Sequence, residues 1–451
     1  MVYDVVVVGA GFSAIAVTIN LVGKLPPSAS IAIIGDDPGF GRGTAYRTEL
    51  YLHRLNVPAG RMSVFPDRPN DFVDWLTRRG RPLQAGDFAS RRDYGLYLRD
   101  TLASLLRNRS ARCRVDFIKA KATGCVERFR VGLAFTLDNA AEILGKNVVL
   151  CLGVGNASLP MEMANLGTEV RKHIVDNPWR LSWLQRIKKF DSVCILGSGL
   201  TMIDQVLALR AHGHEGRIQV LSRRGLIPLA HVRDHPPAVE PILPTGQLTM
   251  SALLQSLRRQ AKACGDWRAL MDGLRPGIQA VWQRLDKSER ARFLRHALPW
   301  WNIHRHRIPS DVSDRLQAML RDATLEIHAG YLTAVAEDGN RLALTYRLRG
   351  RQQIASLQAD WLVNCTGMER AGIRHSPLLQ EMQRQGLIAA DPLGLGIDVD
   401  RTSQIIGSDG QRQPGVYAVG ALTAGQFWEI TAVPDIRVQA KSVSALIAEE
   451  A

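Results

Sequence analysis

The chain has 451 residues, of which 46% are hydrophobic and 22% are charged, and its formal net charge is +14. This apolar content allows large buried cores and excludes global disorder, and at about 100–200 residues per domain the length predicts two to four domains. The basic residues lie in small scattered groups without a nucleic-acid-binding motif, so the charge favours a small anionic partner, or simply a solvated arginine-rich surface, over nucleic acid.

Residues 5–14 form a first nucleotide-binding signature. Four consecutive valines predict a strand buried on both faces, and a GxGxxA motif follows it directly before a helical stretch. Gly9 makes the tight turn, Gly11 lets the backbone approach a pyrophosphate, and Ala14 lets the helix pack closely on the strand. We therefore predict that FAD binds at this turn, whose residues are Gly9, Gly11, Phe12, Ser13 and Ala14.

The next predicted strand, residues 31–34, ends without the usual ribose-binding acid. Gly35 stands in that place, and Asp36 and Asp37 follow it. Either carboxylate can reach the ribose hydroxyls, and we favour Asp36. Asn56 lies further on in a proline-containing loop, where its amide can hydrogen-bond the flavin ring as a catalytic residue. A turn-forming asparagine is the alternative.

A second signature begins at residue 192, where another buried strand runs into a GxG turn and a helix. Its predicted cofactor residues are Gly197, Gly199, Leu200 and Thr201. The strand after this helix ends in Ser222, Arg223 and Arg224. An acid at that position would select NADH, whereas serine and arginines suit the 2′-phosphate of NADPH, unless the arginines are merely exposed. Asp204, on the helix, either braces this site or is an exposed acid.

Two dinucleotide folds in one chain predict an α/β protein with two Rossmann-like domains and a helical subdomain. Strand-to-glycine junctions at Gly153, Gly367 and Gly420 indicate crossings between domains, where the backbone passes close to a cofactor. We expect a first FAD segment at 1–155, an NADP domain at 188–247 and 321–360, a helical subdomain at 248–320, and a second FAD segment at 361–451. The NADP domain is then an insertion.

Two late segments carry candidate substrate-binding residues. The stretch 300–307 combines tryptophans, histidines and arginines, and we expect His304 and Arg307 to form an anion-binding wall with a proton donor. Hydrogen bonding between subdomains is the alternative. Trp428 follows Gly420 and is expected to contact substrate or flavin, unless it is a packed core aromatic. The histidines at i and i+2 are a poor helical metal pair, so we expect no metal.

These features together resemble the FAD-NAD(P)-binding domain family of bacterial flavoproteins. The shared segments are 9–14, 41–46, 55–59 with Met62 and Ser63, 92–98, 177–179, 197–204, 222–231, 301–307 and 420–437. The resemblance implies that Gly43, Thr44, Ala45 and Tyr46 lie along the flavin, and that Met62 contacts a cofactor. The better-understood relatives are similar to NADPH-dependent flavin monooxygenases that hydroxylate nitrogen.

We therefore predict an enzyme in which NADPH reduces FAD, dioxygen forms a C4a-(hydro)peroxyflavin, and an amine or amino acid is hydroxylated on nitrogen. The alternatives are an NADPH-flavin reductase or oxidase, and a non-enzymatic flavin-bound redox sensor. The six cysteines include no CxxC pair, which argues against a disulfide reductase. No signal peptide and no stretch of about 18 apolar residues is found, so we expect a cytoplasmic protein without a membrane partner. A homo-oligomer is left open.

Overall fold

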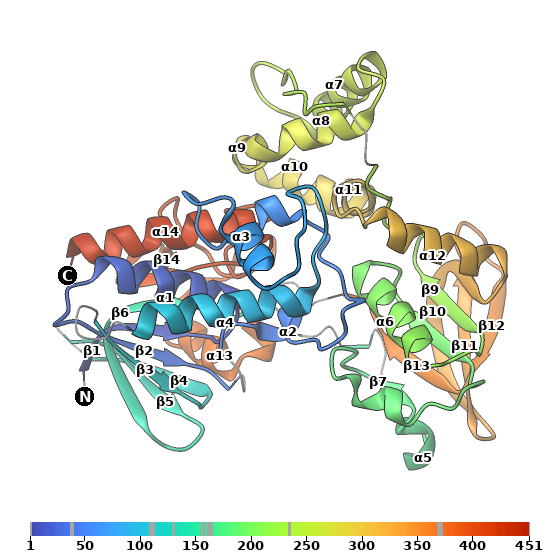
Figure 1. The fold of residues 1–451 in the computed structure, drawn as a ribbon, viewed down its shortest axis with the longest axis horizontal. Coiled ribbons are helices and arrows are strands. Elements are labelled where there is room, and N and C mark those ends of the chain that lie inside the picture. The colour runs from blue at the N-terminus through green and yellow to red at the C-terminus, as the bar shows by residue number, and fades with distance from the viewer. Residues whose placement is uncertain are drawn as a thin grey trace.

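The computed structural model describes residues 2–36, 40–107, 113–128, 131–153, 155, 158–159, 166–232, 236–367 and 373–450. Two lobes, each built on its own β-sheet, lie side by side, and a group of helices drawn in yellow projects above them (Figure 1). None of the helices in these ranges is long and apolar enough to cross a membrane.

The first sheet has a parallel core in the order β3-β2-β1-β6-β15. These strands are β1 (Val2–Val8), β2 (Ser30–Ile34), β3 (Arg114–Ile118), β6 (Glu142–Leu150) and β15 (Arg412–Ala418). β14 (Gln404–Ile406) is antiparallel at one edge, and β4 (Ala122–Arg128) and β5 (Gly132–Leu137) form an antiparallel meander with β6. Val5 to Val8 are at most 2% exposed, as expected for a strand covered on both faces.

Helices cover one face of this sheet, and the other face is covered by one helix together with the antiparallel hairpin. The first face packs against α1 (Phe12–Lys24), α4 (Arg91–Arg107) and α14 (Val433–Glu450). The second packs against α13 (Pro377–Arg384) and the β4–β5 hairpin. The short helices α2 (Gly43–Tyr46) and α3 (Asp71–Arg78) lie beside α4. The first and last parts of the chain thus build one lobe.

The second sheet repeats the same plan in the order β10-β9-β8-β13-β7. Its parallel strands are β7 (Ile174–Val175), β8 (Val193–Leu196), β9 (Ile218–Ser222), β10 (Leu325–Asp338) and β13 (Trp361–Asn364). β10 continues into an antiparallel meander with β11 (Arg341–Leu348) and β12 (Ile354–Ala359). The meander covers one face, while α6 (Leu200–Ala211) and α12 (Ser310–Arg321) cover the other.

Five further helices form the projecting group. They are α7 (Met250–Ala263), α8 (Trp267–Leu274), α9 (Ile278–Arg284), α10 (Lys287–Arg292) and α11 (Leu298–Arg305). Their common core also contains Leu395 and Trp428 of the first lobe. α12 instead packs on the second sheet, because Val312 and Leu316 are buried in that core.

The predicted fold class, two Rossmann-like folds with a helical subdomain, is therefore confirmed. Two strands of the second sheet fall outside the range expected for its domain. β13 lay in the expected second FAD segment, yet it is hydrogen-bonded between β8 and β7. β7 precedes the expected start at residue 188. The pairing of short strands far apart in sequence fixes these positions, and it leaves no local signal in the sequence.

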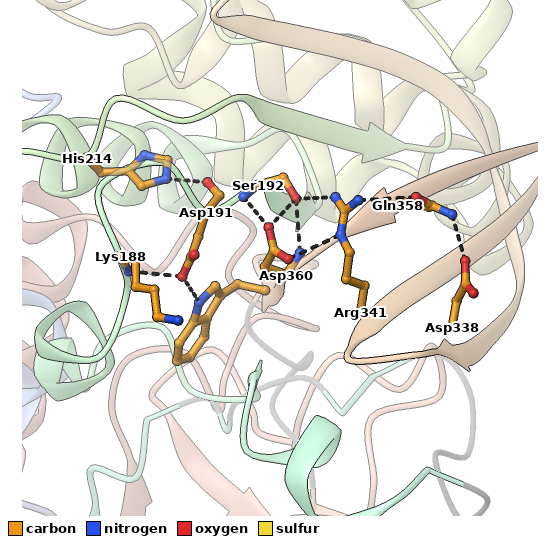
Figure 2. A network of polar contacts seen from close by, with 9 residues as sticks. Lys188, Asp191, Ser192, His214, Asp338, Arg341, Gln358 and Asp360 are labelled. Carbon is orange, nitrogen blue, oxygen red and sulfur yellow. Dashed lines mark hydrogen bonds and ion pairs between the residues drawn. The ribbon is translucent and has the colours of Figure 1, made fainter.

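A polar network closes the amino edge of the second sheet (Figure 2). Asp360 Oδ2 accepts hydrogen bonds of 2.7 Å from both the backbone N and the Oγ of Ser192, and Arg341 Nη2 donates to Ser192 Oγ at 2.8 Å. Asp191 Oδ2 accepts from the Trp361 indole at 2.9 Å. These contacts hold the starts of β8 and β13 together. They lie at the edge opposite the glycine turns, so we assign them to structure.

Candidate active site

The two lobes carry the same glycine turn at the carboxyl edge of their sheets. Gly9 has φ of +134°, and a Cβ on it would lie 2.4 Å from the Cys151 carbonyl oxygen. Gly197 has φ of +97°, and a Cβ on it would lie 2.1 Å from the carbonyl oxygen of Cys365. Only glycine fits either position, because both the backbone angle and the close approach exclude a side chain.

The helix after each turn begins with unsatisfied backbone amides. Gly11 caps α1 and Gly199 caps α6, both in extended conformation and without a side-chain cap. Free N–H groups and the positive end of the helix dipole make such a terminus a binding site for phosphate. Both sites therefore fit the pyrophosphate of a dinucleotide.

The predicted FAD residues from distant parts of the chain converge on the first turn. A Cβ on Gly43 would lie 3.1 Å from the Gly11 Cα, and a Cβ on Gly420 would lie 2.3 Å from Ser13 Oγ. Gly153 follows β6 at the same edge and has open space around it. The structure thus brings together glycines from Gly9 to Gly420, which are 411 positions apart in the sequence.

The other predicted FAD residues differ in how accessible they are. Thr44 is exposed and Ala45 half-buried. Tyr46 packs edge-on against Phe12, and burial raises the pKa of its hydroxyl to about 12. Met62 is 2% exposed and Ala14 fully buried, both within the protein core. Met62 and Ala14 therefore pack within the core, whereas Thr44 stays accessible to a ligand.

Asp36 lies exposed at the end of β2, where its carboxylate is 3.3 Å from Lys121 Nζ. This position leaves the carboxylate able to meet a ribose. Asp37, the other candidate, lies outside the described residues.

The second edge holds the predicted NADP residues. Ser222 ends β9, and its Oγ accepts hydrogen bonds from Ser198 Oγ at 2.9 Å and from the Gly225 backbone at 3.0 Å. Arg223 is exposed and Arg224 half-buried, and neither forms an ion pair with any residue that the structure describes. Two guanidinium groups without an ion pair in the described part of the chain fit an anionic ligand.

Sequence reasoning missed a third arginine at this edge. Arg349, in the turn after β11, donates a hydrogen bond from Nη1 to the Arg223 carbonyl oxygen at 3.2 Å, and its own backbone N bonds Ala329 O at 3.0 Å. The sequence shows a basic group at 347–351, but only the sheet register places it beside β9.

The remaining predicted NADP residues surround the start of α6. Thr201 and Gly367 line one small hollow together with Trp179. Leu200 is the first residue of α6 and is half-buried. The hollow lies between α6 and the end of β13, where a dinucleotide crosses the sheet in Rossmann folds.

The two lobes meet through the 48–56 loop. His231 Nε2 lies 3.2 Å from the Asn56 carbonyl oxygen, and His53 Nε2 lies 3.1 Å from the Asp204 carbonyl oxygen. The Asp204 carboxylate is 3.3 Å from Arg91 Nη2, and both side chains are nearly buried. Burial lowers the pKa of His53, which favours its neutral form. Asp204 thus braces the lobe interface.

His304 and Arg307 both lie against Trp267 in the helical subdomain rather than at this interface. The His304 ring packs edge-on against Trp267 at 4.6 Å, and its Nδ1 lies 2.8 Å from the Trp300 carbonyl oxygen. Arg307 is 4% exposed and forms an ion pair with Asp272. Both contacts lie within the helical subdomain, and the anion-binding wall expected of these two side chains stays a prediction.

Two neighbours of those residues instead face the loop after Gly420. Glu429 Oε1 accepts from the Trp301 indole at 2.6 Å, and its Oε2 lies 2.6 Å from Arg305 Nε. Burial alone would raise the pKa of Glu429, but the charges of Arg305 and His306 and the indole hydrogen bond outweigh it and lower the pKa. Glu429 also has φ of +67°, a strained angle for a residue with a side chain.

Trp428 packs into the helical core. Its ring stacks on Trp282 at 4.6 Å and meets Phe293 edge-on at 5.2 Å. The Trp282 indole also donates to the Gly425 carbonyl oxygen at 2.8 Å. These contacts match the packed-aromatic alternative for Trp428 and dock the helices onto the loop after Gly420.

Comparisons with known proteins agree with this architecture. Residues 6–155 match the FAD-NAD(P)-binding family, which confirms the predicted family for this part of the chain. No curated protein matches the sequence.

Among solved structures, the chain is similar to the ornithine N-hydroxylase of Kutzneria sp. 744, with a TM-score of 0.69, 14% identity and 100% of each chain covered. It is also similar to L-lysine 6-monooxygenase from Pseudomonas syringae, with a TM-score of 0.67, 17% identity and 99% of each chain covered. It is similar as well to a cadaverine monooxygenase from Erwinia amylovora, with a TM-score of 0.68, 14% identity, and 100% of this chain and 95% of that chain covered. At such low identities these likenesses show the fold alone.

Proposed function

We propose that the protein is an FAD- and NADPH-dependent monooxygenase that hydroxylates the nitrogen of an amine or amino acid. The observation that carries this proposal is the duplicated glycine turn, with Gly9 and Gly197 in matching close approaches at two carboxyl edges. One such edge serves a bound flavin, and the second serves a nicotinamide that reduces it. The fold shared with three N-hydroxylating or amine monooxygenases supports the reaction class.

Each lobe has a separate task in this proposal. The free amides at the start of α1 would hold the FAD pyrophosphate, and those of α6 the pyrophosphate of NADPH. Bound FAD supplies hydride acceptance and oxygen activation. The contacts Asn56–His231 and His53–Asp204 would keep the lobes together and limit the entry of water.

The preference for NADPH would come from guanidinium groups at the end of β9. Arg223, Arg224 and Arg349 present positive charge where the 2′-phosphate of the adenosine ribose lies in a Rossmann fold. At the opposite end of the same two strands, Arg217 is instead neutralised by Glu326. A phosphate would supply the missing counter-charge.

The overall reaction would convert an amine, dioxygen, NADPH and a proton to the hydroxylamine, NADP⁺ and water. The test is to purify the protein with FAD and measure NADPH consumption, hydroxylamine formation and hydrogen peroxide with a panel of amines and amino acids. Hydroxylamine formed in near-equal amount to the NADPH consumed is the expected result. Hydrogen peroxide equal to NADPH with every compound would favour the oxidase alternative. A purified protein that does not retain added FAD would refute the proposal.

A further inference from the structure

A cluster of ionised side chains lies where the helical subdomain meets the loop and helix after Gly420. Arg275 and Arg305 come from the helices, while Glu429 and Asp435 come from the loop and the first turn of α14. Their side chains are 11%, 12%, 5% and 22% exposed, so the cluster is largely withdrawn from water.

The two ion pairs in the cluster are unequal. Arg305 Nε and Glu429 Oε2 are in close contact at 2.6 Å. Arg275 Nη2 lies 3.9 Å from Asp435 Oδ2, beyond hydrogen-bonding distance. That Nη2 atom is enclosed and has no hydrogen-bond partner among the described residues. A buried guanidinium with an unfilled donor is costly unless something absent from the chain itself completes it.

The charges are unbalanced as well. Arg61 adds to the positive charge felt by Arg275, and Arg437 acts on Asp435 from the same helix. These groups number four guanidinium groups against two carboxylates. Burial and the charge of Arg305 lower the pKa of Arg275 to about 10, and burial raises the pKa of Asp435. The lowered pKa of Arg275 thus reflects its burial beside other cations, whereas the raised pKa of Asp435 reflects burial that the neighbouring guanidinium groups only partly offset.

The missing anion is not a cofactor phosphate in this arrangement. The FAD pyrophosphate has its own site at α1, and NADPH has α6 and the arginines after β9. The cluster instead lies on the loop that follows Gly420 and near Arg61, in the turn after the Asn56 loop. The cluster therefore fits a third ligand, separate from the two dinucleotides.

We propose that Arg275 binds the carboxylate of an amino-acid substrate, with Arg305 beside it and Glu429 as the positioning residue that holds Arg305. This inference rests on the proposed function, and it narrows the substrate from amines in general to amines that carry a carboxylate. A planar guanidinium can bind a carboxylate through two parallel hydrogen bonds, and the Nη2 atom of Arg275 has no hydrogen-bond partner among the described residues.

The test is isothermal titration of the full FAD-loaded protein with the twenty standard amino acids and L-ornithine. Each amino acid that binds is then compared with its decarboxylated amine. We expect at least one amino acid to bind and its amine to bind at least about 10-fold more weakly. Arg275→Gln should lower the affinity for the amino acid by about 10- to 100-fold and the affinity for the amine by less than about twofold.

Two further variants control for folding and charge. Arg275→Lys keeps the positive charge but loses the planar guanidinium and its paired donors. It should therefore still fold and bind the amino acid with an intermediate affinity. Arg292→Gln removes an exposed arginine of the same helical group that pairs with the buried Glu289, and this variant should bind amino acids as the wild type does. Flavin content and the rate of flavin reduction by NADPH should be unchanged in all three variants.

Several outcomes would overturn the carboxylate site. The first is that no amino acid binds, and the second is that the amine binds as tightly as the amino acid. The third is that Arg275→Gln and Arg275→Lys both bind the amino acid as the wild type does. Loss of FAD or NADPH affinity in Arg275→Lys would assign the cluster to a cofactor phosphate instead. Amino-acid binding without hydroxylamine formation would refute the monooxygenase but leave this site standing.

Discussion

Replacing Arg349 by alanine should weaken NADPH binding while leaving NADH binding and the maximal rate unchanged. Arg349 reaches the end of β9 only through the sheet register, and its guanidinium touches the Arg223 carbonyl oxygen through a single Nη1 donor. Arginine has five N–H donors, so the others stay available for a phosphate.

The size of the effect follows from one lost charge-assisted contact. A hydrogen bond to a charged group contributes about 1.5–3 kcal/mol, which corresponds to roughly 10- to 150-fold in affinity. Arg349 is exposed, and solvent and salt screen exposed charges. We therefore expect the lower end, an increase of about 10-fold in KM for NADPH, which shrinks as the salt concentration rises.

The assay compares KM for NADPH and NADH, together with direct binding of 2′,5′-ADP to the FAD-loaded protein. Arg351→Ala is the matched control, because it removes the same charge from the same turn but makes no side-chain contact with Arg223 among the described residues. Equal losses for NADPH and NADH, or equal effects of Arg349→Ala and Arg351→Ala, would refute the phosphate assignment.

Three further predictions concern the turns and the lobe interface. Gly197→Ala should lower the free energy of unfolding in urea by about 3 kcal/mol, because its Cβ would lie 2.1 Å from the Cys365 carbonyl oxygen. Gly199 has open space around it, so Gly199→Ala should keep the stability of the wild type and lose NADPH affinity. Equal stabilities of the two variants would contradict this prediction. Asp204→Asn should lower the free energy of unfolding by about 2 kcal/mol through the loss of the buried Arg91 ion pair, and an unchanged urea midpoint would disprove it. Burial lowers the pKa of His53 below its usual 6.5, so protonation favours the unfolded chain. The stability that the neutral ring provides above that pH is therefore lost as the pH falls. In His53→Gln, the melting temperature should fall less steeply between pH 7 and 5 than in the wild type.

The fold and the cofactor turns could be predicted because their signals are local. A run of buried residues, a glycine that tolerates a positive φ, and a helix start lie within ten positions of one another at both turns. Close approach to Cys151 or Cys365 is nonlocal, yet it is forced by the same turn, since the next parallel strand must pass there. The predicted convergence on Gly420 follows from the same topology.

The residues of the 300–307 stretch could not be assigned from sequence, because their direction depends on how α11 is rotated. Trp301 and Arg305 are four positions apart and share one face of the helix, which meets Glu429. His304 and Arg307 point instead to the Trp267 and Asp272 side of the helical core. A four-residue spacing in the sequence hints at this pairing, but nothing local tells which face meets the first lobe.

The repetition of the two lobes makes their differences informative. The Gly9 amide bonds Ile34 O at 2.8 Å, and the Gly197 amide bonds Leu221 O at 2.9 Å, so the two strand ends are equivalent positions. Counting two residues on from each carbonyl gives Asp36 in the first lobe and Arg223 in the second. The same place in the fold thus carries a negative charge where ribose hydroxyls would bind and a positive charge where a 2′-phosphate would bind. This reversal of charge at equivalent strand ends supports the proposed assignment of FAD to the first lobe and NADPH to the second.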